Sequence, residues 1–309
     1  MPPPRGEEDP PLVVRGKIDR IDVDVGTGSA VVIDYKAGGK IGLQAQLRDD
    51  ASVSGAMKTP AGYMFKETPE GRNPQSADPV GDTLREMDKY NIETAIFTLS
   101  SASPTATERA AAEHPSRRFR PVLSVDPNRG MDAVRDIARA HAELGIVGVG
   151  LFPVGYVPPV PINDKRMYPV YTKCAELDIA VFCTSGVPGP RLPFDAQYTG
   201  LVDEVCWFFP ELRFVLRHGC EPWTDLAVKL LLKWPNLYYS TSAFAPRYYP
   251  KEIVEFANTR GADKVIYAGY YPMGLTLERI FRELEDVPFR EHVWPKFLRE
   301  NAVEALKLA

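Results

Sequence analysis

Eight short apolar segments recur along the chain, and their spacing constrains the fold more than any other feature. Each is a continuous run rich in Val, Ile, Phe and Tyr, a pattern typical of parallel strands that are buried on both faces. The predicted strands are Lys40–Leu47, Glu93–Leu99, Phe119–Val125, Val147–Phe152, Ile179–Ser185, Leu212–His218, Leu237–Ser242 and Lys264–Tyr270.

Amphipathic stretches of helical length separate these strands. The clearest are Pro79–Tyr90, Gly130–Leu144, Met167–Leu177 and Trp223–Trp234. A strand followed by a helix, eight times over, predicts an α/β protein with a (β/α)8 TIM barrel. A doubly wound open sheet is the alternative, but no glycine-rich phosphate fingerprint follows the first strand.

The predicted barrel occupies residues 40–309, which leaves residues 1–39 as an N-terminal extension. A start at Ile21–Gly28 is a second way to begin the barrel, ranked below Lys40–Leu47. Long loops follow the first and fourth predicted strands, and a proline-rich loop follows the fifth. All three lie on the side where barrels hold their active sites.

Composition excludes several classes of protein. The formal net charge of −4 argues against nucleic acid as the main partner. The N-terminus has no apolar core of a signal peptide, and no run approaches membrane-spanning length. The 4 cysteines are scattered without a CxxC pair, so we expect reduced thiols in a cytoplasmic protein with no membrane partner.

The strand ends resemble a known family. The stretches that carry the resemblance are "YPVYTKCAELDIAVFCTSG", "FPELRFVLRHGCEPW", "KWPNLYYSTSA", "DKVIYAGYYPMG" and a final "FLRENAVEAL". In this order they resemble the amidohydrolase superfamily, in the branch that includes aminocarboxymuconate-semialdehyde decarboxylase. The resemblance covers about Lys40 to the C-terminus and implies the barrel fold.

The resemblance also implies a divalent metal, but the matching positions differ from the family pattern. The paired histidines of the first strand fall on Gln44 and Gln46, the fifth-strand histidine on Thr184, and the eighth-strand aspartate on Tyr270. Only the sixth-strand histidine is kept, as His218. Because zinc prefers imidazole, thiolate or carboxylate, we predict no metal and no cofactor.

His218 is then the main catalytic candidate, as the acid/base of a metal-independent reaction. Tyr270 is the second, because its phenol can donate to a developing oxyanion. An aromatic plug in the vacated metal site is the alternative for Tyr270. Cys183 and Cys220 are weaker candidates for a nucleophile, since a barrel cysteine is more often an apolar filler.

A set of residues around the predicted mouth is expected to bind the substrate. Arg247 lies among aromatic residues after the seventh strand, where it would bind an acidic ring or lie at a subunit interface. His114, His141 and His292 fall in or near helices and are predicted to be structural. The predicted substrate-binding residues are Gln44, Gln46, Thr184, Trp223, Arg247 and Tyr271.

The segment Val13–Gly38 resembles a different family, the PD-(D/E)xK nucleases. Its matching residues are Asp19, Asp34 and Lys36, which would hold Mg²⁺ there. The rest of a nuclease domain does not fit into the 12 residues upstream, and an isolated hairpin is marginal in water. We therefore interpret this segment as an appended fragment.

The sequence thus predicts a barrel enzyme that cleaves a C–N, C–O or C–C bond of a small carboxylated cyclic substrate, as a hydrolase or carboxy-lyase. The expected assembly is a homo-oligomer. A catalytically silent barrel that binds a ligand or a partner protein is the alternative, and a nuclease is a distant third.

Overall fold

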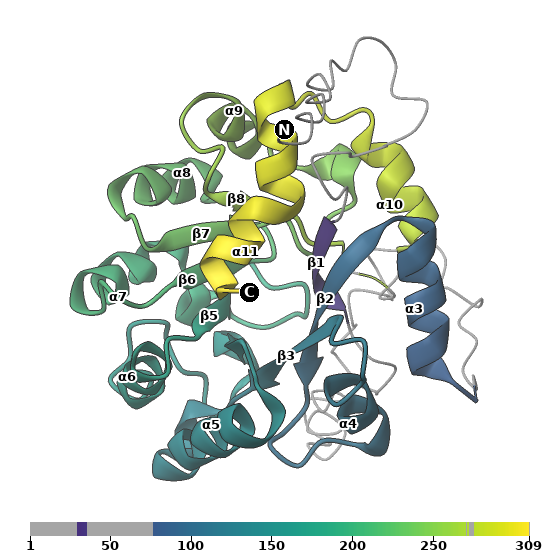
Figure 1. Cartoon of the computed structure of the whole chain (residues 1–309). Coiled ribbons are helices and arrows are strands. Elements are labelled where there is room, and N and C mark those ends of the chain that lie inside the picture. Colours follow the sequence, from purple (N-terminus) through teal and green to yellow (C-terminus); the bar gives the residue numbers. More distant parts are fainter. Residues whose placement is uncertain (1–29, 36–76, 270, 272–274, 309) are drawn as a thin grey trace, which may run out of the picture.

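The computed structural model describes residues 30–35, 77–269, 271 and 275–308. Its strands form one eight-stranded sheet in the order β1 to β8, and the pairings of successive strands from β1 to β8 are all parallel. The sheet curls into a TIM-barrel-like ring with the helices outside it (Figure 1). The predicted fold class is confirmed.

The strands β2–β8 coincide with the last seven predicted segments. Strand β2 begins one residue before its predicted run, at Ile92, and the other six are shorter than the runs that predicted them, β8 most of all with two residues. The strands are β1 Ala30–Tyr35, β2 Ile92–Leu99, β3 Phe119–Ser124, β4 Gly148–Leu151, β5 Ala180–Thr184, β6 Phe214–Arg217, β7 Leu237–Ser240 and β8 Val265–Ile266.

Helices connect the strands and cover the outside of the ring. Local signals explain where they begin: Asp78 caps α3, and Thr105 with Glu108 forms a capping box on α4. Helix α5 ends at Gly145, which adopts a left-handed conformation. The helices are α3 Pro79–Lys89, α4 Ala106–Ala112, α5 Met131–Leu144, α6 Tyr168–Glu176, α7 Val202–Phe208, α8 Thr224–Lys233, α9 Lys251–Thr259, α10 Leu277–Leu284 and α11 Asn301–Leu306.

The first strand differs from its prediction. The strand beside β2 is β1, from the segment interpreted as an appended fragment, and Ala30, Val31, Val32 and Tyr35 pair with residues of β2. The sequence AVVIDY is rich in β-branched residues, which favour a buried strand. The predicted first strand, Lys40–Leu47, lies outside the described residues. The division of the chain at residue 40 therefore stays a prediction.

Two apolar clusters make the core. The larger lies between the sheet and the helices, and the smaller lies inside the ring, with Val122, Phe182 and Val215 among its residues. Helix α11 adds Ala302, Ala305 and Leu306 to the inner cluster. It therefore closes the N-terminal end of the ring, where it crosses the strands in Figure 1.

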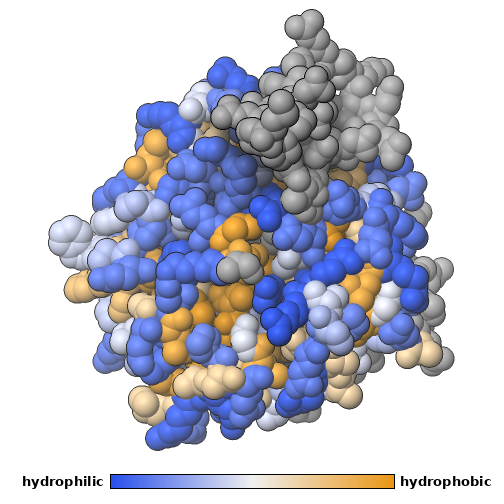
Figure 2. All heavy atoms as spheres, in the orientation of Figure 1, coloured by the Kyte–Doolittle hydropathy of each residue, from blue (hydrophilic) through white to orange (hydrophobic). Residues whose placement is uncertain are grey.

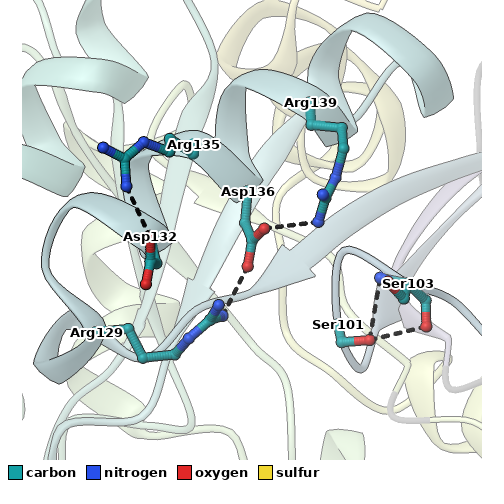
Figure 3. Close-up of polar contacts among 7 residues, drawn as sticks. All are labelled: Ser101, Ser103, Arg129, Asp132, Arg135, Asp136 and Arg139. Atoms are coloured by element: carbon teal, nitrogen blue, oxygen red, sulfur yellow. Dashed lines mark hydrogen bonds and ion pairs between the residues drawn. The ribbon is translucent and has the colours of Figure 1, made fainter.

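Hydrophilic residues cover most of the face seen in Figure 2, and hydrophobic residues form separate patches between them. On the outer side of α5, arginines pair with aspartates (Figure 3). Arg135 binds Asp132, while Arg129 and Arg139 both bind Asp136, each over 2.7 Å. Within the described part of the chain, none of the helices has the length and hydropathy needed to cross a membrane.

Candidate functional site

His218 directly follows β6 at the carboxyl end of the ring, as predicted. Its ring Nδ1 lies 3.0 Å from Oγ of Ser242, which follows β7. The backbone N–H of His218 donates to the same oxygen over 3.2 Å. Ser242 thus holds both the backbone and the ring of His218, and the ring turns its Nε2 away from this contact.

The turn that carries His218 has an unusual backbone. His218, Gly219 and Cys220 all have positive φ angles, of 64°, 96° and 62°. Residues other than glycine rarely adopt positive φ angles, and such backbone strain persists only where surrounding contacts fix it. Here a Cβ on Gly219 would lie 2.4 Å from the Phe244 ring, so only glycine fits at the centre of the turn.

The loop after β5 supplies contacts that fix this turn. The backbone N–H of Cys220 donates to Ser185 O over 3.2 Å, and Tyr239 donates its hydroxyl to Gly219 O over 3.2 Å. The Ser185 hydroxyl lies 2.8 Å from that of Thr199, which donates to Cys220 O. The strained turn is therefore held from both neighbouring strands.

Two polar side chains at the ends of β5 and β6 face the inside of the ring. Phe182 and Val215 belong to the inner apolar cluster, and side chains alternate along a strand. Thr184 and Arg217, each two residues further on, therefore face inward as well. They are also direct neighbours in the pairing of β5 with β6.

The Arg217 side chain reaches across the interior towards β4. Its Nη1 is 3.9 Å from the point that a Cβ on Gly150 would occupy. Burial raises the pKa of the Tyr156 phenol, and the positive charge of Arg217 partly offsets this rise. Burial likewise raises the pKa of the Cys183 thiol, again partly offset by Arg217. A guanidinium thus lies among β4, β5 and β6.

The remaining predicted site residues lie in different surroundings. The Trp223 ring packs against Phe194 and Tyr198, with ring centroids 5.1 and 4.9 Å away. Arg247 is mostly exposed, lies over the Tyr248 ring and is 3.7 Å from Glu283. Tyr271 packs against the outer apolar cluster. Gln44, Gln46 and Tyr270 lie outside the described residues.

The described residues do not fit a divalent metal. Among them, no group of three His, Cys, Asp or Glu side chains lies close enough to hold one. Thr184, which the resemblance predicted at the place of a fifth-strand ligand, offers only a neutral hydroxyl, a weak zinc ligand. The adjacent Cys183 is fully buried and its Sγ points to Thr184 O over 3.6 Å.

The cysteines behave as apolar fillers. Cys174, Cys183, Cys206 and Cys220 are all free and buried. Burial raises the pKa of the Cys220 thiol to about 12, partly offset by hydrogen bonds from Ser185 and Thr199. A thiol that stays protonated at neutral pH is a poor nucleophile, so this supports the interpretation of Cys183 and Cys220 as filler.

Sequence reasoning missed Arg217 and Ser242. A signal for Arg217 was present, because it lies two residues after Val215 on a buried strand and so shares the inward face. No local pattern could reveal Ser242, since its contact with His218 joins residues 24 positions apart.

Comparisons with known proteins agree with this architecture. A family profile described as Amidohydrolase matches residues 57–308. A 2-keto-4-carboxy-3-hexenedioate hydratase from a Sphingobium strain is 30% identical over 113 residues, which span 32% of this chain and 33% of that protein. The chain thus spans about a third of the length of this relative.

Two solved structures share the fold. An uncharacterized TIM-barrel protein from Bordetella bronchiseptica superposes with a TM-score of 0.67 at 21% identity, covering 90% of this chain and 98% of that one. A 5-carboxyvanillate decarboxylase from Novosphingobium aromaticivorans gives a TM-score of 0.63 at 14% identity, covering 93% and 99%. The latter was solved with manganese and 4-hydroxy-3-methoxy-5-nitrobenzoic acid.

Proposed function

Because the chain belongs to the Amidohydrolase family, we propose that it is an enzyme that cleaves or hydrolyses a bond in a small carboxylated cyclic substrate. The reacting bond is of the C–N, C–O or C–C type, and His218 serves as the acid/base. The named relatives act as a decarboxylase and a hydratase on carboxylated compounds, which supports a lyase or hydrolase.

One observation carries the proposal: the His218–Ser242 contact at the carboxyl end of the ring. A fixed imidazole is the only common side chain that exchanges protons near neutral pH at its ordinary pKa. Because Ser242 Oγ already accepts from the His218 backbone N–H, its own proton can go to Nδ1. Nε2 is then the ring nitrogen that faces the substrate.

The surroundings of His218 suit an acidic ring. Arg217, which carries a guanidinium, directly precedes His218 in the chain. Beyond the turn, Trp223, Phe194 and Tyr198 form an aromatic cluster. A cation binds a carboxylate, and aromatic side chains pack against a ring. Gln44, Gln46, Thr184, Arg247 and Tyr271 remain proposed binding residues, with Tyr270 as a proposed donor to the oxyanion.

We propose that the reaction proceeds without a metal, since the described donors do not form a ligand set. Every step assigned to this chain is therefore a proton transfer or a hydrogen bond by its own side chains. A catalytically silent barrel is the alternative, in which the same residues bind a ligand and no bond is broken.

The test is a panel of cyclic carboxylic acids, screened by thermal shift and then for turnover in the presence of a chelator. Ligand at about 100 times its Kd should stabilise the fold by about 2.7 kcal/mol. His218→Ala should lower kcat by about 10²- to 10⁴-fold, the usual contribution of a general acid or base. The exposed His292→Ala is the matched control.

The other outcomes separate the alternatives. Binding of a carboxylate without turnover would identify the silent barrel. Turnover that the chelator removes and manganese restores, together with near-stoichiometric metal by elemental analysis, would contradict the metal-independent reaction. Turnover that is equal in wild type and His218→Ala would contradict the role of His218.

A further inference from the structure

The pairing registers place Arg217 in a defined layer inside the ring. In a barrel of this kind each strand is displaced by about one residue from its neighbour, and alternate strands supply the four inward side chains of a layer. Followed around the sheet, the registers join Thr98 of β2, Gly150 of β4, Arg217 of β6 and Ala268 after β8. The three neighbours of Arg217 in this layer are small and neutral.

Small neighbours leave room for the long side chain. The 3.9 Å between Arg217 Nη1 and the Cβ point on Gly150 shows that the guanidinium spans the distance from β6 past β5 to β4. Val122 and Phe182 of the inner apolar cluster form the layer below. Arg217 therefore lies one layer nearer the carboxyl end of the ring, above a largely apolar layer.

Two polar residues lie on the side towards the carboxyl ends of the strands. Ser124, two residues beyond Val122 on the same face of β3, is exposed. Thr184, beside Arg217 in the ladder, is only 4% exposed, and within the described part of the chain its Oγ1 has no hydrogen-bond partner. A buried hydroxyl normally has a partner, so a ligand oxygen would complete this one.

We propose that Arg217, together with the Thr184 hydroxyl, binds the carboxylate of the substrate inside the ring. The inference rests on the proposed function and specifies where the acid group of that substrate lies. The guanidinium donates to one or both carboxylate oxygens, and Thr184 donates to one of them. The ring of the ligand then lies next to His218, which follows Arg217 in the chain. The carboxylate is thus assigned to Arg217, while the exposed Arg247, 3.7 Å from Glu283, remains a proposed contact to another part of the substrate.

The test compares acids with their amides. The probes are benzoate, 2,6-dihydroxybenzoate and 4-hydroxy-3-methoxybenzoate, each paired with its neutral amide, and calorimetry gives each Kd. Wild type should prefer at least one acid over its amide. Arg217→Gln should weaken binding of that acid by about 10- to 100-fold, as expected for a hydrogen bond to a charged group, and should leave the amide unchanged. Arg217→Lys should keep part of the preference, because lysine lacks the bidentate fork.

Arg135→Gln is the matched control, since it removes an arginine from the outer side of α5 (Figure 3). It should bind like wild type. A second variant tests the site without altering Arg217. Gly150→Asp brings a carboxylate next to Nη1 and should abolish the preference for the acid, whereas the neutral Gly150→Asn should retain more of it. Thermal unfolding without ligand verifies that each variant is folded.

The two failures look different. If wild type prefers an acid and both Arg217→Gln and Gly150→Asp keep that preference, the assignment to Arg217 is wrong and the proposed function stands. If wild type binds or converts neutral cyclic compounds and shows no preference for any acid, the proposed carboxylated substrate is wrong, and the assignment fails with it.

Discussion

The two ends of the barrel are built on opposite principles. At the N-terminal end, α11 inserts Ala302, Ala305 and Leu306 into the inner apolar cluster. Arg213 joins that helix to the sheet, because its Nε donates to Ala305 O over 2.6 Å. At the carboxyl end, the Thr184 hydroxyl has no partner in the described part of the chain, and two non-glycine residues have positive φ angles in one turn.

This difference indicates where the chain is optimised for stability and where for function. Apolar burial by α11 stabilises the N-terminal end, although Arg120 Nε and Asn236 Oδ1 there have no partner among the described residues. At the N-terminal end, positive φ angles occur at single turn residues such as Asn91, Arg117 and Asp178, whereas at the carboxyl end three consecutive residues, 218–220, have them. A consecutive run of strained backbone costs stability, and such features are concentrated at functional sites. Changes at the N-terminal end should therefore alter unfolding, while changes at the carboxyl end should alter ligand binding.

The largest expected effect comes from removing a strand of the sheet that joins the two ends of the barrel. Deleting residues 1–38 removes β1, whereas deleting residues 1–29 retains it. Without β1, the backbone N–H and C=O groups of β2 lose their partner strand, and unpaired buried backbone groups are strongly unfavourable. The longer deletion should lose cooperative unfolding and ligand binding together, as measured by circular dichroism and calorimetry.

The shorter deletion is the control and should unfold cooperatively. If the longer deletion unfolds with the same midpoint as the shorter one, β1 is dispensable. The barrel then begins after residue 38, as the division at residue 40 predicts.

The next effect separates the two ends. Leu306→Ala removes a buried side chain from the inner cluster, which should lower the free energy of unfolding by about 2–5 kcal/mol. Its matched partner is Thr184→Val at the carboxyl end, which removes a hydroxyl without changing the shape. Because that hydroxyl has no partner in the described structure, the substitution should leave stability equal or slightly higher.

Binding of the preferred acid should show the reverse order. It should weaken in Thr184→Val and stay unchanged in Leu306→Ala. Urea unfolding and calorimetry of the two variants measure both quantities. Equal losses of stability in the two variants would mean that the ends do not differ.

The same contrast explains which parts could be predicted from the sequence. Strands β2–β8 were predictable because each is a continuous apolar run such as Gly148–Leu151, and burial on both faces leaves that pattern. The first strand was not, since AVVIDY and KIGLQAQL are both suitable strands. Which of them pairs with β2 depends on contacts more than 50 residues apart.

The candidate site was predictable only in part. His218 follows a strand that the pattern located, so its place at the mouth could be inferred. Its conformation could not, because the positive φ depends on Gly219 packing against Phe244 and on Ser242. The inward face of Arg217 could be inferred from alternation along β6, but the reach of its guanidinium to Gly150 of β4 could not.

The smallest effect tests whether surface charge helps to close the N-terminal end. Hydrogen bonds from Lys307, after α11, and from Arg213 hold the pKa of the Asp178 carboxyl below its usual value. Because the folded-state pKa lies below the unfolded-state pKa of about 4, the ionised carboxylate stabilises the fold at any pH above about 4. This stabilisation is lost as the pH falls from about 4 through the folded-state pKa. Asp178 is half exposed, so the contribution should be at most about 1 kcal/mol and smaller at high salt.

Asp178→Asn should thus be slightly less stable than wild type at pH 7, and the difference should vanish at acid pH. Asp132→Asn, which breaks the fully exposed pair with Arg135 and removes an acid from the first turn of α5 (Figure 3), is the control and should cost less at acid and neutral pH alike. Denaturant unfolding across this pH range measures both differences, and a loss for Asp178→Asn that is no larger than the control, or that does not change with pH, would show that this ion pair does not stabilise the closed end.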